Sequence, residues 1–438
     1  MTRWSFRHVC ALLSVLFLLA ACAEEAADPV ATEPAGEETV ATVDTEDGGT
    51  EATEATDTPD TATETGAATA TETAGDADAE EGPIRMGAVL DITGPGANLG
   101  GPERDTLQLL AEQINAAGGV DGREVELDIR DNQSREDEAA TQLTSLLQEE
   151  VDIILGASRT GPSLAMRPLA EQAEVPMISL AANQAIVDGS EWVFKTAQND
   201  RVVIEKIVAY METQGWETVG LARDASAFGE GVADLFRDVS GNADIVAVEE
   251  RFATDATEFT AQMVSLRSAG ADVNVIWGIP PAAATATQAY RDLGLDTPLM
   301  HSHGIGNQVF LEVAGPAAEG VVFPIGRLLV ADELGDDDPQ KEVITTFVAD
   351  YQEAYGAPPS TFAGHAYDAF QLAVQAFGEV GTDPAAVRDY LETAELTGIS
   401  GVFQMSPEDH SGLTSDALVI VEVAGGDWTL AADQPDGS

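Results

Sequence analysis

The chain has 438 residues and a formal net charge of -57, with 77 acidic side chains against 20 basic ones. Acidity on this scale argues against nucleic acid and anionic lipid surfaces as partners, because both would repel the protein. Its only cysteines are Cys10 and Cys22, so the rest of the chain contains no disulfide and no thiolate metal site.

Residues 1–22 have the features of an export signal. Arg3 and Arg7 precede an apolar run, Val9 to Leu19, which is too short to span a bilayer of about 30 Å as a mature helix. The run ends in Leu-Ala-Ala-Cys, which resembles a bacterial lipobox. We therefore expect Cys22 to be lipidated and to anchor the mature chain to the outer face of the cell membrane. An ordinary signal peptide with a chance cysteine is the alternative.

Residues 23–83 are acidic and rich in Thr and Ala. From Ala23 to Gly82 there are 19 acidic residues, no Lys or Arg, and no apolar side chain larger than valine. Such a segment cannot bury enough apolar surface to offset its ordering entropy, and its like charges extend it. We expect a disordered tether that holds a globular part clear of the membrane.

From Ile84 onward, short apolar strands alternate with segments of helical periodicity, a pattern typical of a parallel sheet covered on both faces. The Gly- and Pro-rich segment 91–101 predicts a loop. The predicted strands are Ile84–Leu90, Val125–Ile129, Asp152–Leu155 and Pro176–Leu180, and the predicted helices are Thr106–Ala117, Glu136–Leu147 and Ser163–Ala173.

A second series of the same kind follows. Its predicted strands are Thr218–Ala222, Ile245–Glu250, Val273–Trp277, Leu299–His301 and Leu418–Val423, and its helices are Val202–Gln214, Gly229–Val239, Glu258–Ala269 and Ala282–Leu293. Around Val321–Val330 the chain is expected to return to the first half, where helices Lys341–Tyr355 and His365–Phe377 follow.

The pattern predicts two α/β lobes, each a parallel sheet flanked by helices, with a ligand at the carboxyl ends of the strands. We assign the first lobe to 84–199 and 326–405, and the second to 200–325 and 406–438. The three crossings are expected near 195–200, 323–328 and 401–412.

Catalytic and cofactor motifs are missing from the sequence. It has no phosphate-binding glycine loop, nucleophile elbow or helical His pair with a glutamate, so we expect neither a cofactor nor an enzyme. His301 and His303 would face the same side of a strand and in principle suit a metal. Because the sequence offers few obvious residues as a third metal ligand, we prefer to interpret the two histidines as a polar pocket edge, and we expect no metal.

The segment from Gly156 to Gly161 ends a strand and opens a helix. A helix N-terminus offers unpaired N–H groups and a partial positive charge, which suit a carboxylate. Thr160 can add a hydroxyl donor and Arg159 a full charge. The alternative is that Ser158 or Thr160 only caps its own helix.

The order of these motifs resembles the leucine/isoleucine/valine-binding branch of the type I periplasmic binding proteins, from residue 84 to about 430. The pieces that carry the resemblance are Gly94-Pro95, Ile114–Val120, Gly122-Arg123, Gly156–Gly161, Ile178–Asn183, Phe228–Gly231 and Gly315–Gly320. It implies hinge closure of two lobes on a small ligand and delivery to the membrane permease of an ABC importer. A sensor lipoprotein of the same fold is the alternative function, and a hydrolase using His303 is a third.

The resemblance also implies a set of ligand-binding residues. Thr160 would hold the ligand carboxylate with help from Ala181 and Asn183, and Phe228 would cover the ligand. The remaining pocket walls match Leu99, Pro280 and Phe362.

His303 matches the acid that pairs with the ligand ammonium in that family, and imidazole cannot replace a carboxylate there. An organic or aromatic acid without an amine therefore competes with an amino acid as the ligand. The alternative is that Asp224 or Glu230 takes over the ammonium. A disulfide of some family members matches Ser134 and Arg159, which cannot form one here.

Overall fold

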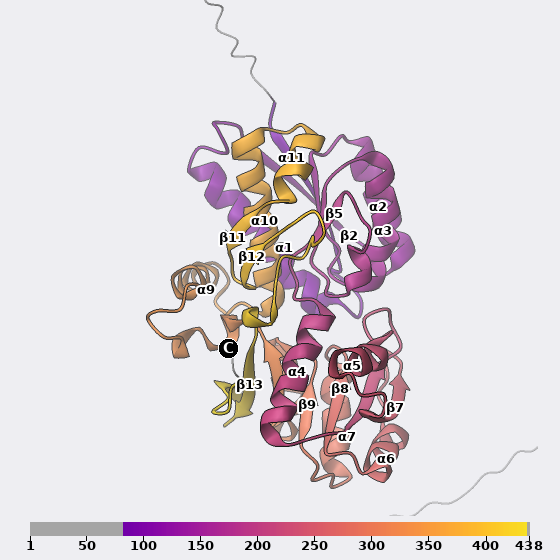
Figure 1. The fold of residues 1–438 in the computed structure, drawn as a ribbon. Helices are drawn as coiled ribbons and strands as arrows, with labels where there is room; N and C mark the ends of the chain where they lie inside the picture. Colours follow the sequence, from indigo (N-terminus) through magenta and orange to yellow (C-terminus); the bar gives the residue numbers. More distant parts are fainter. Residues whose placement is uncertain (1–81, 436–438) are drawn as a thin grey trace, which may run out of the picture. The chain divides into compact units, whose positions relative to one another are not determined.

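The computed structural model describes residues 82–435 (Figure 1). The predicted signal peptide, the lipidation site at Cys22 and nearly all of the predicted tether lie outside these residues. Within 82–435, no helix combines the length and the apolar character that crossing a membrane requires.

The first sheet is entirely parallel, with the strand order β2-β1-β3-β4-β5. Its strands are β1 (Ile84–Leu90), β2 (Val125–Asp131), β3 (Ile153–Gly156), β4 (Met177–Ser179) and β5 (Val193–Lys195). Helices α2 (Glu136–Gln148) and α3 (Thr160–Ala173) cover one face, while α1 (Ala97–Ala116) and α10 (Thr361–Val380) pack together on the other (Figure 1).

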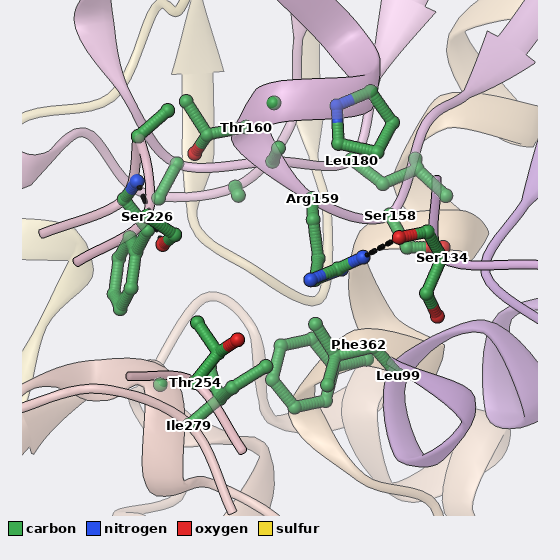
Figure 2. Close-up of a pocket in the computed structure, with 18 of the residues that line it drawn as sticks. Leu99, Ser134, Ser158, Arg159, Thr160, Leu180, Ser226, Thr254, Ile279 and Phe362 are labelled. Carbon is green, nitrogen blue, oxygen red and sulfur yellow. Dashed lines mark hydrogen bonds between the residues drawn. The ribbon is translucent and has the colours of Figure 1, made fainter. Parts of the chain in front are cut away.

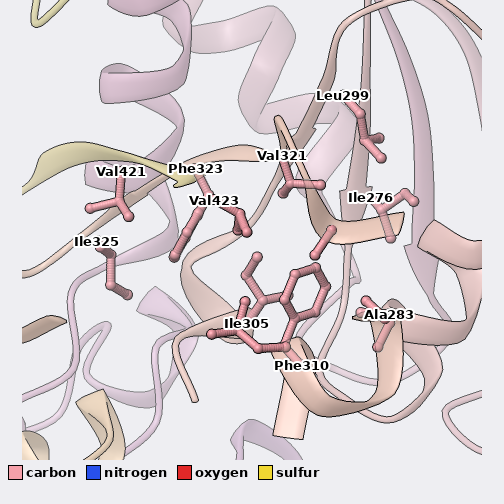
Figure 3. Packing of buried hydrophobic residues seen from close by; sticks show 14 of the residues in the cluster. Ile276, Ala283, Leu299, Ile305, Phe310, Val321, Phe323, Ile325, Val421 and Val423 are labelled. Carbon is pink, nitrogen blue, oxygen red and sulfur yellow. The ribbon is translucent and has the colours of Figure 1, made fainter. Parts of the chain in front are cut away.

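The second sheet has the order β14-β13-β10-β9-β8-β6-β7, in which only the pairings of β13 are antiparallel. Its strands are β6 (Val219–Asp224), β7 (Val246–Phe252), β8 (Val273–Trp277), β9 (Leu299–His301), β10 (Val322–Ile325), β13 (Val419–Ala424) and β14 (Asp427–Leu430). Helices α4 (Asp200–Gln214) and α5 (Val232–Ser240) pack on one face, and α6 (Thr260–Ala269), α7 (Ala282–Asp292) and α8 (Gln308–Ala314) on the other. Figure 3 shows part of the core on the α7 and α8 face, where Phe310 lies beneath the strands.

The predicted parallel sheets flanked by helices are therefore confirmed. The remaining elements are α9 (Lys341–Tyr355), α11 (Pro384–Leu391), the hairpin β11 (Glu395–Thr397) and β12 (Val402–Gln404), and five short 3-10 helices. These are η1 (Gln184–Ile186), η2 (His303–Ile305), η3 (Gly315–Ala318), η4 (Arg327–Glu333) and η5 (Ser415–Ala417).

The packing departs from the sequence-based lobe boundaries in two places. Residues of η4 and α9, such as Leu328 and Phe347, share a core cluster with the second sheet and not with the first. Conversely, residues up to Ala417 pack in the core of the first sheet, and Leu418 is the first to join the second. The last crossing therefore lies after Ala417, because the apolar side chains beyond 405 extend the first core.

The predicted loop at 91–101 is wrong in its second half, because α1 already begins at Ala97. Gly100 lies in the first turns of that helix, and a Cβ atom there would sit 2.4 Å from the backbone of Asp91. Glycine at this position therefore permits a close approach of the helix to the end of β1, and does not mark a turn.

Candidate functional site

A cavity of about 240 Å³ lies where the carboxyl ends of strands from both sheets meet, as expected for open parallel sheets (Figure 2). The loops after β1 and β2, the turn into α3 and the end of β4 contribute from the first sheet. The turns after β6 and β8, and η2 after β9, contribute from the second. The start of α10 completes the wall with Phe362 and His365.

Most residues that the sequence predicts for the site come together in this cavity. Those that line it are Leu99, Arg159, Thr160, Ala181, Phe228, His303 and Phe362. Asn183 and Pro280 are not among the lining residues. The Asn183 side chain accepts from Ala185 N at 2.9 Å to cap η1, and donates to the Ala227 carbonyl at 3.3 Å. After β8 it is Ile279, and not Pro280, that borders the cavity.

The N-terminus of α3 faces the cavity and carries no side-chain cap. The N–H groups of Thr160 and Gly161 have no intrahelical acceptor, Pro162 has no N–H, and Ser163 N donates to the Arg159 carbonyl at 3.1 Å. Ser158 instead bonds to the buried carboxyl of Glu103 and accepts from Asp91 N at 3.0 Å. The alternative in which Ser158 or Thr160 caps the helix is thus wrong, and two backbone donors remain for a ligand.

Arg159 lines the cavity, and hydrogen bonds to the first-sheet residues behind it fix its side chain. Its Nε donates to the fully buried carboxylate of Asp91, and its Nη2 donates to the Ser134 carbonyl at 2.5 Å (Figure 2). Asp91 also accepts from Asn132 Nδ2 at 2.7 Å. Nη1 makes no hydrogen bond to the described part of the chain. The guanidinium is therefore fixed in place with one nitrogen still unused.

Asp224 is a lining residue that the sequence offered only as an alternative. It ends β6, its side chain is buried, and Oδ1 accepts from Ser226 N at 3.0 Å and Ser226 Oγ at 2.6 Å. Burial raises the pKa of this carboxyl, and the bonds from Ser226 oppose that rise. Glu230, the other alternative, lies outside the lining and pairs with Arg223 at 3.0 Å and with Arg251.

The two histidines of the His-Ser-His segment do not act as a pair. His301 Nε2 lies 3.0 Å from Thr287 Oγ1 and its ring packs against Phe310, away from the cavity. His303 lines the cavity with its ring edge-on to Phe228, their centroids 5.7 Å apart. Residues 82–435 contain no group of three His, Cys, Asp or Glu side chains suited to a metal ion.

Three histidines near the site are neutral. Burial lowers the pKa of His301, His303 and His365 to about 3. His365, which sequence reasoning missed, lines the cavity and places Nδ1 2.8 Å from Ser400 Oγ. No local pattern marks it, since it occupies one buried position among many on α10. Of the three, His303 and His365 line the cavity, where a neutral imidazole can offer hydrogen bonds but no charge.

A buried charge pair lies close to the cavity wall at the chain's first passage between sheets. Lys195 Nζ donates to the carbonyls of Ala182 and Ala197, each at 2.8 Å, and both of these residues line the cavity. Burial lowers the pKa of Lys195 and raises that of Asp200, while their opposite charges counteract both shifts. The two opposite charges therefore attract each other through space, without a direct ion pair among the described residues.

Two α/β sheets whose strand ends share one cavity, joined by repeated chain crossings, define the type I class of two-lobed binding proteins. Residues 83–427 match the family described as periplasmic binding protein, and the chain belongs to that family. It is a binding protein and not an enzyme, and membership of the family implies an extracytoplasmic location.

The relatives found by sequence share about a quarter of their residues with this chain. A "Leu/Ile/Val-binding protein homolog 3" from Brucella melitensis is 24% identical over 72% of this chain and 84% of its own length. A "Leucine-, isoleucine-, valine-, threonine-, and alanine-binding protein" from Pseudomonas aeruginosa is 27% identical over 70% of this chain and 82% of its own.

Solved structures support the fold. An extracellular ligand-binding receptor from Rhodopseudomonas palustris HaA2 superposes with a TM-score of 0.75 at 26% identity, covering 80% of this chain and 100% of its own. A branched-chain amino acid transporter substrate binding protein from Streptococcus pneumoniae, in complex with isoleucine, gives 0.71 at 25% identity, covering 81% and 100%.

Proposed function

We propose that the protein captures a small carboxylate-bearing ligand outside the cytoplasm and delivers it to the membrane permease of an ABC importer. The observation that carries this proposal is the uncapped N-terminus of α3 beside Arg159 in the cavity. The names of the relatives support it, since two are named for binding amino acids that include leucine, isoleucine and valine, and a third is a transporter's substrate binding protein with isoleucine bound.

The ligand carboxylate is held in this proposal by the Thr160 hydroxyl, the N–H groups of Thr160 and Gly161, and Nη1 of Arg159. Backbone donors at a helix N-terminus stabilise negative charge without the cost of reorganising water around it. The apolar part of the ligand packs against Leu99, Phe228, Ile279 and Phe362. Because each sheet contributes only part of the cavity, closing the lobes on the ligand is what completes the site and marks the loaded state for the permease.

The attachment to the membrane is part of the same proposal. Lipid on Cys22 anchors the mature chain, and the acidic segment up to residue 83 sets the distance over which the binding domain reaches the permease. Mass spectrometry of the protein from its own cells tests the anchor, because a mature N-terminal cysteine with a diacylglycerol mass is the expected result.

A ligand screen tests the binding function. We expect at least one L-amino acid or small organic acid to raise the melting temperature and to bind in calorimetry, while the primary amide of the same compound binds at least about tenfold more weakly. Equal binding of the acid and its amide would contradict a carboxylate site at α3. Loss of uptake of that compound in cells that lack the protein would support transport.

A further inference from the structure

Most charged groups around the cavity interact closely with an opposite charge of the protein. Arg159 is paired with Asp91, Lys195 lies with Asp200, and Glu230 pairs with two arginines. Glu136 also borders the cavity, but it is exposed to solvent. Asp224 is 2% exposed and forms no ion pair at contact distance within residues 82–435, although the charge of Arg159 acts on it from farther away. Burying an unpaired charge is costly, so this carboxylate is suited to a partner that the protein itself does not supply.

One oxygen of Asp224 is already used by the protein. Oδ1 accepts both hydrogen bonds from Ser226, and the Ser226 hydroxyl in turn accepts from Phe228 N at 3.2 Å. Oδ2 accepts no hydrogen bond within the described range, although an ionised carboxylate has about four acceptor positions. The turn after β6 therefore fixes the orientation of the carboxylate and leaves Oδ2 for a donor in the cavity.

We propose that Oδ2 of Asp224 binds a cationic group of the ligand and thereby selects zwitterionic ligands over acids that lack a cation. The proposal rests on the proposed function, since it concerns the same cavity. Asp224 is thus assigned as a residue that determines specificity.

The arrangement of charge in the cavity carries this assignment. The donors for a carboxylate belong to α3 on the first sheet, and Asp224 belongs to β6 on the second. A ligand with both charges bridges the two sheets, with Phe228 and Ile279 around its apolar part. His303 stays neutral in its buried position and cannot neutralise an ammonium, so the acid that position 303 lacks is supplied by Asp224.

The test compares each of several apolar L-amino acids with its deaminated acid in calorimetry: L-leucine with 4-methylpentanoate, L-phenylalanine with 3-phenylpropanoate and L-valine with 3-methylbutanoate. In the wild-type protein we expect the amino acid of at least one pair to bind at least about tenfold more tightly. Asp224→Asn keeps the shape and the acceptor for Ser226. It should weaken the amino acid at least about tenfold and the deaminated acid less than about threefold.

The matched control is Glu230→Gln, which removes a nearby carboxylate outside the cavity and should leave the preference unchanged. If Asp224→Asn does not fold, the comparison of each amino acid with its deaminated acid in the wild-type protein still tests the preference that the assignment requires. Deaminated acids that bind as tightly as their amino acids overturn the assignment of Asp224 and leave the carboxylate site standing. If no member of any pair and no other carboxylate binds, both the proposed function and the assignment of Asp224 are overturned.

Discussion

Nη2 of Arg159 donates a 2.5 Å hydrogen bond to the backbone carbonyl of Ser134. These are the two positions that match a disulfide in some members of the resembled family, and here a hydrogen bond joins them. Because Nε of the same guanidinium is bound to buried Asp91, Arg159 both braces the loops of the first sheet and lines the cavity.

We predict that Arg159→Met lowers the free energy of unfolding by about 3–5 kcal/mol, because it leaves the buried carboxylate of Asp91 without its cation. Urea denaturation of the unliganded protein measures this. The control is Arg237→Met, which removes an exposed pair with Asp234 and should cost less than about 1 kcal/mol.

A second substitution separates charge from packing. Adding Asp91→Asn to Arg159→Met should recover part of the lost stability, because the unpaired charge is then gone. A single Arg159→Met variant no less stable than the Arg237→Met control would show that the buried pair contributes nothing.

Thr160→Val should weaken binding of the carboxylate ligand by about 1–3 kcal/mol, since it keeps the shape of the side chain and removes the hydroxyl donor. Calorimetry with the best ligand of the screen measures the change. Thr254, which borders the cavity from beyond β7, offers a matched Thr→Val control that should leave the affinity within about threefold. Equal effects of the two variants would reject a specific role for Thr160.

His301 should make stability depend on pH. Its pKa is lowered by burial to about 3 in the folded protein, against about 6.5 in the unfolded chain. The unfolded state therefore binds the extra proton, and the stabilisation present above about pH 6.5 is lost as the pH falls towards 3. Between pH 7 and pH 5, the wild type should lose about 2 kcal/mol relative to His301→Gln. Urea denaturation at both pH values measures this. A difference in the free energy of unfolding between the two proteins that is the same at pH 7 and pH 5 would contradict the prediction.

The acidic N-terminal segment should be separable from binding. A protein that begins at Gly82 should keep the ligand affinity and the melting temperature of one that begins at Cys22, because residues 23–81 contain no apolar side chain larger than valine. Calorimetry and thermal unfolding of both forms check this. A large loss of either quantity would show that the segment contacts the binding domain.

The elements that sequence predicted well are those whose signal is local. Helix α9 has the predicted bounds 341–355 because apolar spacing and a C-terminal glycine define it. The start of α1 was missed because Gly100 looks like a loop residue in the sequence. Its glycine is required by the nearby backbone of Asp91, a contact that exists only in the folded structure. Strand β5 was missed because a strand of three residues that are all buried shows no alternation of apolar and polar side chains.

The site shows the same division. Thr160 and Arg159 could be predicted to line the cavity because a strand end followed by a helix start is visible in the sequence. Asn183 occupies a matching position, yet its side chain caps η1, an outcome decided by local turn geometry. Asp224 was named only as an alternative, since an acid at a strand end is common and nothing in the sequence shows that its neighbours leave it unpaired.

The core of the first sheet is completed from a distant part of the chain. Buried residues of β1 and α1 share their cluster with α10, α11 and residues as late as Ala417, and five strands of the other sheet lie between them in sequence. A chain that emerges from its N-terminus first therefore lacks one wall of this core until almost all of it is available. Such non-local closure is slow, because the entropy of a long loop is lost before the contacts form. The first lobe of such a chain can become stable only once residues up to Ala417 are available to complete its core.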